Sequence, residues 1–161
     1  MSCDVAAAAF LFLASSSPSH ALPVLRIDAP AAGAQSALSR EPLFADIVQR
    51  AAKLKADTEV YRKGTAKAAS APLALPRFDD FQSRIAALSD LDMKGHVELA
   101  KRGTDGDLKC ILRGISQDLP KKLDELMKAG DAATQATALR DMYYLLNDNV
   151  EVITAPPQPE V

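Results

Sequence analysis

From residue 41 onward, hydrophobic residues recur at steps of three and four positions, which is the spacing of one face of an α-helix. The first such segment begins near Glu41, where Pro42 suits the first turn, and ends at Gly64. Its predicted inner face consists of Phe44, Ile47, Ala51, Leu54, Thr58 and Tyr61. A linker rich in Ala and Pro follows at 65–76.

The second segment begins near Arg77. Its predicted inner face consists of Phe78, Phe81, Ile85 and Leu88, followed by Met93, Val97 and Ala100. The polar run at 89–92 is a candidate interruption between these two groups. Gly103 is expected to stop the helix, because glycine readily adopts the left-handed conformation that ends helices.

The third segment runs from about Asp105 to Ala129 and contains a proline at position 120. Its predicted inner face consists of Leu108, Ile111, Leu112, Ile115, Leu119, Leu123, Leu126 and Met127. A proline inside a helix lacks a backbone donor and clashes with the preceding turn. We therefore expect a kink or a restart near Asp118, which could cap the restarted helix.

Gly130 closes the third segment, and Asp131 is predicted to cap the fourth. The predicted inner face of the fourth segment consists of Ala132, Ala136, Leu139, Tyr143, Leu146 and Val150. No strand-like alternation competes with these patterns. Four helices of ~20 residues, joined mostly by short turns, favour an all-α fold, an antiparallel up-and-down four-helix bundle over 41–154. A Pro-rich tail follows at 155–161.

The start of the chain has a different pattern. Residues 5–14 form an apolar run that is too short to span a bilayer but fits the core of an export signal, and 19–21 reads as a small-x-small cleavage site. We interpret 1–21 as an export signal, although 1–4 lack the usual positive charge; the alternatives are a buried helix or a disordered tail. Residues 22–40, rich in Ala, Pro and Ser, are predicted to form an extended N-terminal arm.

The composition and the motifs of the chain argue against several classes of function. The 161 residues have a formal net charge of −2, whereas a nucleic-acid binder needs a basic excess to displace counterions. Two Cys and two His cannot form a structural zinc site of the finger type, and we predict no metal site. No catalytic motif is present, and His96 is interpreted as a solvated or core-edge histidine. We therefore predict a protein that is not an enzyme and has no small-molecule substrate.

A haem-binding bundle is the main alternative, since bundles of this size can hold haem between a Met and a His. The available ligands are Met93, Met127, Met142 and His96. The chain has no CxxCH motif, and only one histidine remains after removal of the signal. We therefore predict no cofactor.

Two stretches resemble a known family. They are 107–123, which contains DLKCILRGIS and DLPKKL, and 143–153, which reads YYLLNDNVEVI. Both are similar to the PsbQ-like extrinsic subunits of photosystem II, including the PsbQ-prime and diatom-type relatives of red-lineage algae. The likeness extends over roughly 78–153 and rests on helix patterning more than on invariant residues.

The resemblance implies a non-catalytic four-helix bundle in the chloroplast thylakoid lumen, peripheral on the membrane. Its partners would be the photosystem II core and other extrinsic subunits, and its role would be to stabilise the oxygen-evolving complex and its calcium and chloride environment. Cations that could face an acidic lumenal surface are Lys53, Lys55, Arg62, Lys63, Lys101, Arg102 and Arg113. The first helix is basic along one side, whereas Asp79, Asp80, Asp90 and Asp92 are predicted to make the second acidic. The alternative is a small exported haem-binding or adaptor bundle.

Overall fold

The computed structural model describes residues 36–66, 70–103 and 106–155. They form a short 3-10 helix, η1 (Leu38–Arg40), and four α-helices, and they contain no strand. The helices are α1 (Pro42–Thr65), α2 (Phe78–Arg102), α3 (Gly106–Met127) and α4 (Ala132–Thr154). The predicted all-helical fold is confirmed.

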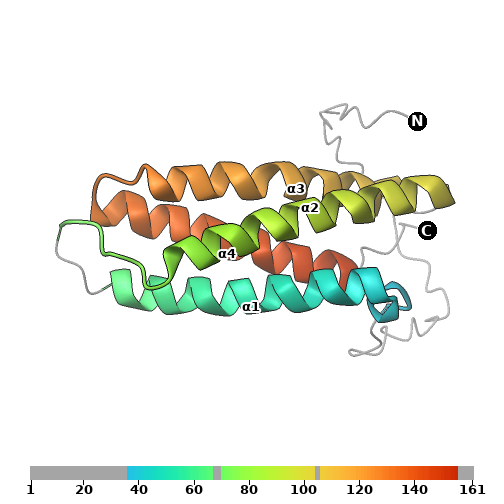
Figure 1. The fold of residues 1–161 in the computed structure, drawn as a ribbon, viewed down its shortest axis with the longest axis horizontal. Helices are drawn as coiled ribbons and strands as arrows, with labels where there is room; N and C mark the ends of the chain where they lie inside the picture. The colour runs from blue at the N-terminus through green and yellow to red at the C-terminus, as the bar shows by residue number, and fades with distance from the viewer. Residues whose placement is uncertain (1–35, 67–69, 104–105, 156–161) are drawn as a thin grey trace, which may run out of the picture. The chain divides into compact units, whose positions relative to one another are not determined.

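Successive helices run in opposite directions (Figure 1). Helix α1 packs on α2 and α4, and α3 packs on the same two helices, so that the four close into a ring around one core. The α1–α4 and α2–α3 contacts are the most extensive, and α2 and α4 lie diagonally across the bundle. No helix within the described ranges is both long and apolar enough to cross a membrane.

The predicted arm is corrected at its end, where 38–40 form η1 instead of extended chain. The backbone N–H of Ser36 donates to the carbonyl of Thr154 at 3.1 Å, which holds this short segment against the end of α4. The proposed export signal at 1–21, residues 22–35 of the arm and residues 156–161 of the tail lie outside the described residues.

The inner face of α1 is confirmed in full, since all six predicted residues are buried. Hydrogen bonds hold the linker after α1 across the end of the bundle. The hydroxyl of Tyr61 donates to the carbonyl of Pro76 at 2.7 Å, and the side-chain amide of Gln135 makes two hydrogen bonds with the backbone of Leu73. Helix α1 is thus part of the bundle through its buried face, and its linker is held by α1 and α4.

Helix α2 corrects the prediction in its second half. It runs without a break through 89–92, and its buried face continues through Asp92, Gly95 and Leu99. The predicted inner face instead continued through Met93, Val97 and Ala100. These residues lie beside the buried face, and Val97 is exposed. Gly95 is buried where a Cβ would lie 3.1 Å from Leu112 Cδ1, so a small residue allows close packing there. Gly103 ends α2 with a φ of +67°, as predicted.

Helix α4 has the predicted Asp131 cap but a rotated inner face. The carboxylate of Asp131 accepts from the backbone N–H of Thr134 at 2.7 Å. Leu139 and Leu146 are buried as predicted, whereas Ala132, Ala136, Tyr143 and Val150 are only partly buried. The remaining buried positions are Gln135, Ala138, Met142, Asn149 and Ile153. The polar residues Gln135 and Asn149 thus occupy core positions that the periodicity assigned to apolar neighbours.

Helix α3 continues across Pro120, so the expected restart near Asp118 is wrong. A proline leaves the carbonyl four residues earlier without its helical donor. That carbonyl belongs to Ser116, and it accepts a hydrogen bond from the Ser89 hydroxyl of α2 at 2.7 Å. The neighbouring helix therefore supplies the missing donor. At the end of α3, Met127 is exposed instead of buried.

Candidate partner-binding surface

The seven candidate cations do not form one cluster. Lys53, Lys101 and Arg113 are exposed and form no ion pair with any described residue. Lys101 and Arg102 lie at the end of α2, whereas Arg62 and Lys63 lie at the end of α1. Because α1 and α2 run in opposite directions, these two pairs are at opposite ends of the bundle (Figure 1).

Arg102 holds two helices together. Its guanidinium donates to both carboxylate oxygens of Glu41 at 2.7 and 2.9 Å and to Glu98 at 3.2 Å, and it lies 5.7 Å from the ring centre of Phe44. Hydrogen bonding to Glu41 raises the pKa of Arg102, and the same bond lowers the pKa of Glu41. Arg102 thus bridges the start of α1 and the end of α2, and its docking role stays a prediction.

A groove of about 400 Å³ lies between the end of α1 and the first half of α4. It is lined by Glu59, Arg62, Lys63, Thr65, Ala66, Ala136, Thr137 and Arg140. We call it the α1–α4 groove. It brings together two of the predicted cations, Arg62 and Lys63, with Arg140, which the sequence analysis did not select.

The α1–α4 groove is positively charged, because three cations line it beside a single carboxylate, Glu59. Glu59 pairs with Arg62 at 2.8 Å and with Lys63 at 3.8 Å, and Arg140 pairs with its neighbour Asp141 at 3.0 Å. The side chains of Lys63 and Arg140 are 75% and 53% exposed. Exposed pairs of this kind contribute little to stability, so both cations can exchange their present partners for a new anion.

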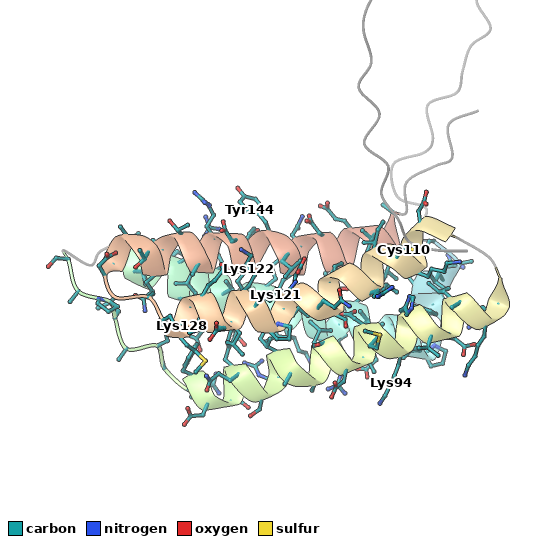
Figure 2. All side chains as sticks on the ribbon, turned by 90° about the horizontal axis from the view of Figure 1, so that it is seen from above. Lys94, Cys110, Lys121, Lys122, Lys128 and Tyr144 are labelled. Atoms are coloured by element: carbon teal, nitrogen blue, oxygen red, sulfur yellow. The ribbon has the colours of Figure 1, made fainter. Side chains whose placement is uncertain are left out.

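Aromatic residues continue this surface along α4. The Arg62 guanidinium lies 4.8 Å from the ring centre of Tyr143, and the Lys55 ammonium lies 6.0 Å from the same ring. Lys55 also donates to the side chain of Asn147 at 3.2 Å. Tyr143 packs edge-to-face on Tyr144, which is 56% exposed and projects away from the bundle (Figure 2). The α1–α4 side therefore presents cations and an aromatic side chain together, a combination suited to a partner surface.

The residues considered for haem are dispersed. Nδ1 of His96 lies 2.7 Å from the backbone carbonyl of Lys109, on α3. Met127 is on the same helix as Lys109 but about 27 Å further along, from the rise of 1.5 Å per residue. Met142 is buried and Met93 is partly buried. No group of three or more potential metal-ligating side chains gathers anywhere in the described ranges.

Of the four residues predicted to make α2 acidic on its outer face, only Asp92 is misplaced. It is fully buried, and it accepts a hydrogen bond from Nδ2 of the buried Asn149, on α4, at 2.8 Å. Burial raises the pKa of Asp92 to about 8, although the bond from Asn149 acts in the opposite direction. Sequence reasoning missed this pair, because it normally assigns a polar residue to the surface.

Comparison of the chain with known proteins identifies no relative. No protein-family model matches it, and neither the curated proteins nor the solved structures give a match.

Proposed function

We propose that the chain is a non-catalytic extrinsic subunit that docks on the lumenal face of photosystem II and stabilises the oxygen-evolving complex with its calcium and chloride environment. In this proposal an export signal delivers it to the thylakoid lumen. The mature protein is an antiparallel up-and-down bundle with an N-terminal arm. The family resemblance of 107–123 and 143–153 supports the identity of the partner.

The observation that carries the docking proposal is the α1–α4 groove. The chain as a whole has a formal net charge of −2, yet three cations and one carboxylate line this groove. A local positive surface on an acidic protein favours association with an acidic partner surface and rejects a basic one. Much of this attraction is between exposed charges, so concentrated salt would screen it.

The test is co-purification. The full chain is added to photosystem II membranes that have been washed with concentrated salt, and binding and oxygen evolution are measured at low salt. We expect the chain to bind, to be released again by concentrated salt, and to reduce the added calcium and chloride that oxygen evolution requires. A chain that stays in the supernatant at low salt, or that binds without changing this requirement, would contradict the proposal.

One absorption spectrum of the purified chain separates the proposal from the haem-binding alternative. We expect no Soret band. A Soret band that persists through purification would replace the proposal with the alternative.

A further inference from the structure

Asp92 and Asn149 form an isolated polar pair in the middle of an apolar core. Asp92 is on α2 and Asn149 is on α4, and these helices lie diagonally across the bundle. Both side chains have no solvent exposure. The bond between them therefore crosses the core, and bulk solvent does not reach either group.

One side-chain oxygen of each residue has no hydrogen-bond partner among the described residues. They are Oδ1 of Asp92 and Oδ1 of Asn149. Both atoms are acceptors when Asp92 is ionised, so neither can satisfy the other, and leaving two buried acceptors without partners is costly. A proton on Asp92 changes this, because a carboxylic acid is also a donor.

We propose that Asp92 and Asn149 form a buried binding site for one proton, which Oδ1 of Asp92 carries and donates to Oδ1 of Asn149. The amide Nδ2 of Asn149 already donates to Oδ2 of Asp92 at 2.8 Å. The added proton closes a ring of two opposed hydrogen bonds between an acid and an amide. Both unpartnered atoms are then satisfied by a single proton. This proposal does not depend on the docking function.

No charged group among the described residues lowers the pKa of Asp92 and so favours its ionised form. The pKa of Asp92 responds only to burial, which raises it to about 8, and to the Asn149 amide. In the described part of the chain, no cation of any helix forms an ion pair with Asp92, and Asn149 is the only polar group that bonds to it. At neutral pH the folded chain would therefore hold one proton that the unfolded chain releases.

The direction of the pH effect follows from this difference. An unfolded Asp ionises near pH 4, whereas Asp92 in the bundle stays protonated up to about pH 8. Between these limits the native state binds the extra proton, so the equilibrium constant for unfolding rises by up to tenfold for each unit of pH increase. Above the upper limit the effect levels off.

The experiment compares urea unfolding of the full chain and its Asp92→Asn variant from pH 5 to pH 9. An Asn at this position can donate to Oδ1 of Asn149 at every pH, so it imitates the protonated acid. We expect the unfolding constant of the native chain, relative to that of Asp92→Asn, to rise by up to tenfold per pH unit and to level off at high pH. Asp90→Asn, at an exposed position of the same helix, is the matched control and should leave the native pH slope unchanged.

A ratio between the native chain and Asp92→Asn that does not vary with pH would overturn the proposal. It would mean that Asp92 is ionised, with another group such as a buried water molecule satisfying the two oxygens. If Asp92→Asn does not fold, the native chain with ¹³C-labelled Asp carboxyls decides by NMR. One carboxyl signal that stays in the protonated position at pH 7 is expected, and its absence would also overturn the proposal.

Discussion

Two carboxamides are buried on the inner face of α4, about four turns apart, and their surroundings differ. Gln135 accepts from the N–H of Leu73 at 2.9 Å and donates to its carbonyl at 2.8 Å, so both ends of the amide are satisfied. Among the described residues, the side chain of Asn149 has the single bond to Asp92, and its oxygen has no partner. Gln135 thus holds a linker by bonds that no titration alters, whereas the Asn149 site is complete only when Asp92 is protonated.

The comparison shows how this bundle accommodates polar residues in its core. A backbone segment offers one donor and one acceptor, which match an amide without further help. A carboxylate offers only acceptors, so it matches an amide only after it binds a proton. The expected loss of stability on each substitution depends on which hydrogen-bonding group is left without its partner.

Asn149→Ala should have the largest effect on stability. It removes the only hydrogen-bond partner of Asp92 among the described residues and leaves a small cavity beside a buried carboxyl. We expect a loss of about 2–4 kcal/mol in the free energy of unfolding at pH 7, measured with urea. A loss below about 0.5 kcal/mol would show that the pair contributes little to the fold.

Gln135→Ala should have a smaller effect. The N–H and carbonyl of Leu73 lose their partner, but Leu73 is 42% exposed, so water can replace the amide. We expect a loss of about 1–2 kcal/mol that is the same from pH 5 to pH 9. Amide hydrogen exchange at Leu73 should become faster, while exchange in the middle of α1 changes little. A loss that varies with pH would contradict the difference between the Gln135 site and the titratable Asp92–Asn149 site.

Ser89→Ala should have the smallest effect of the three. The hydroxyl donates to the Ser116 carbonyl, which Pro120 leaves without a helical donor. We expect a loss of about 0.5–1 kcal/mol, independent of pH, because one neutral hydrogen bond is removed. The control is Ser89→Ala made in a chain that already carries Pro120→Ala. The Pro120→Ala substitution restores the helical N–H donor to the Ser116 carbonyl, so Ser89→Ala should lower the free energy of unfolding by less in that chain. Equal losses in both backgrounds would mean that the hydroxyl does not compensate for the proline.

The sequence predicted the helices well where their inner faces are apolar. The inner face of α1 was predicted except for Thr65 at its end, because its core positions hold hydrophobic residues together with Thr58. The hydroxyl of Thr58 bonds back to the Leu54 carbonyl of its own helix at 2.8 Å. The faces of α2 and α4 were rotated because Asp92, Gln135 and Asn149 lie in the core. Their partners are distant in sequence, so periodicity places such residues on the surface.

The candidate surface was predictable only in part. Arg62 and Lys63 follow each other in the sequence, and the basic side of α1 identified them. Arg140 was missed because it lies on α4, and hydrophobic spacing does not say which helices are neighbours. The bond between Arg102 and Glu41 was not predicted for the same reason, since Glu41 lies at the start of another helix.

The docking surface is tested most directly by two variants with equal changes in charge. Lys63→Glu with Arg140→Glu reverses two cations of the α1–α4 groove, whereas Lys94→Glu with Lys121→Glu reverses two exposed cations outside it that are not docking candidates. Binding of each variant to salt-washed photosystem II membranes is measured at low salt. We expect the groove variant to bind at least about tenfold more weakly than the native chain, a change of about 1.4 kcal/mol, and the second variant to bind nearly as well as the native chain. Equal binding by the two variants would contradict a docking role for the groove.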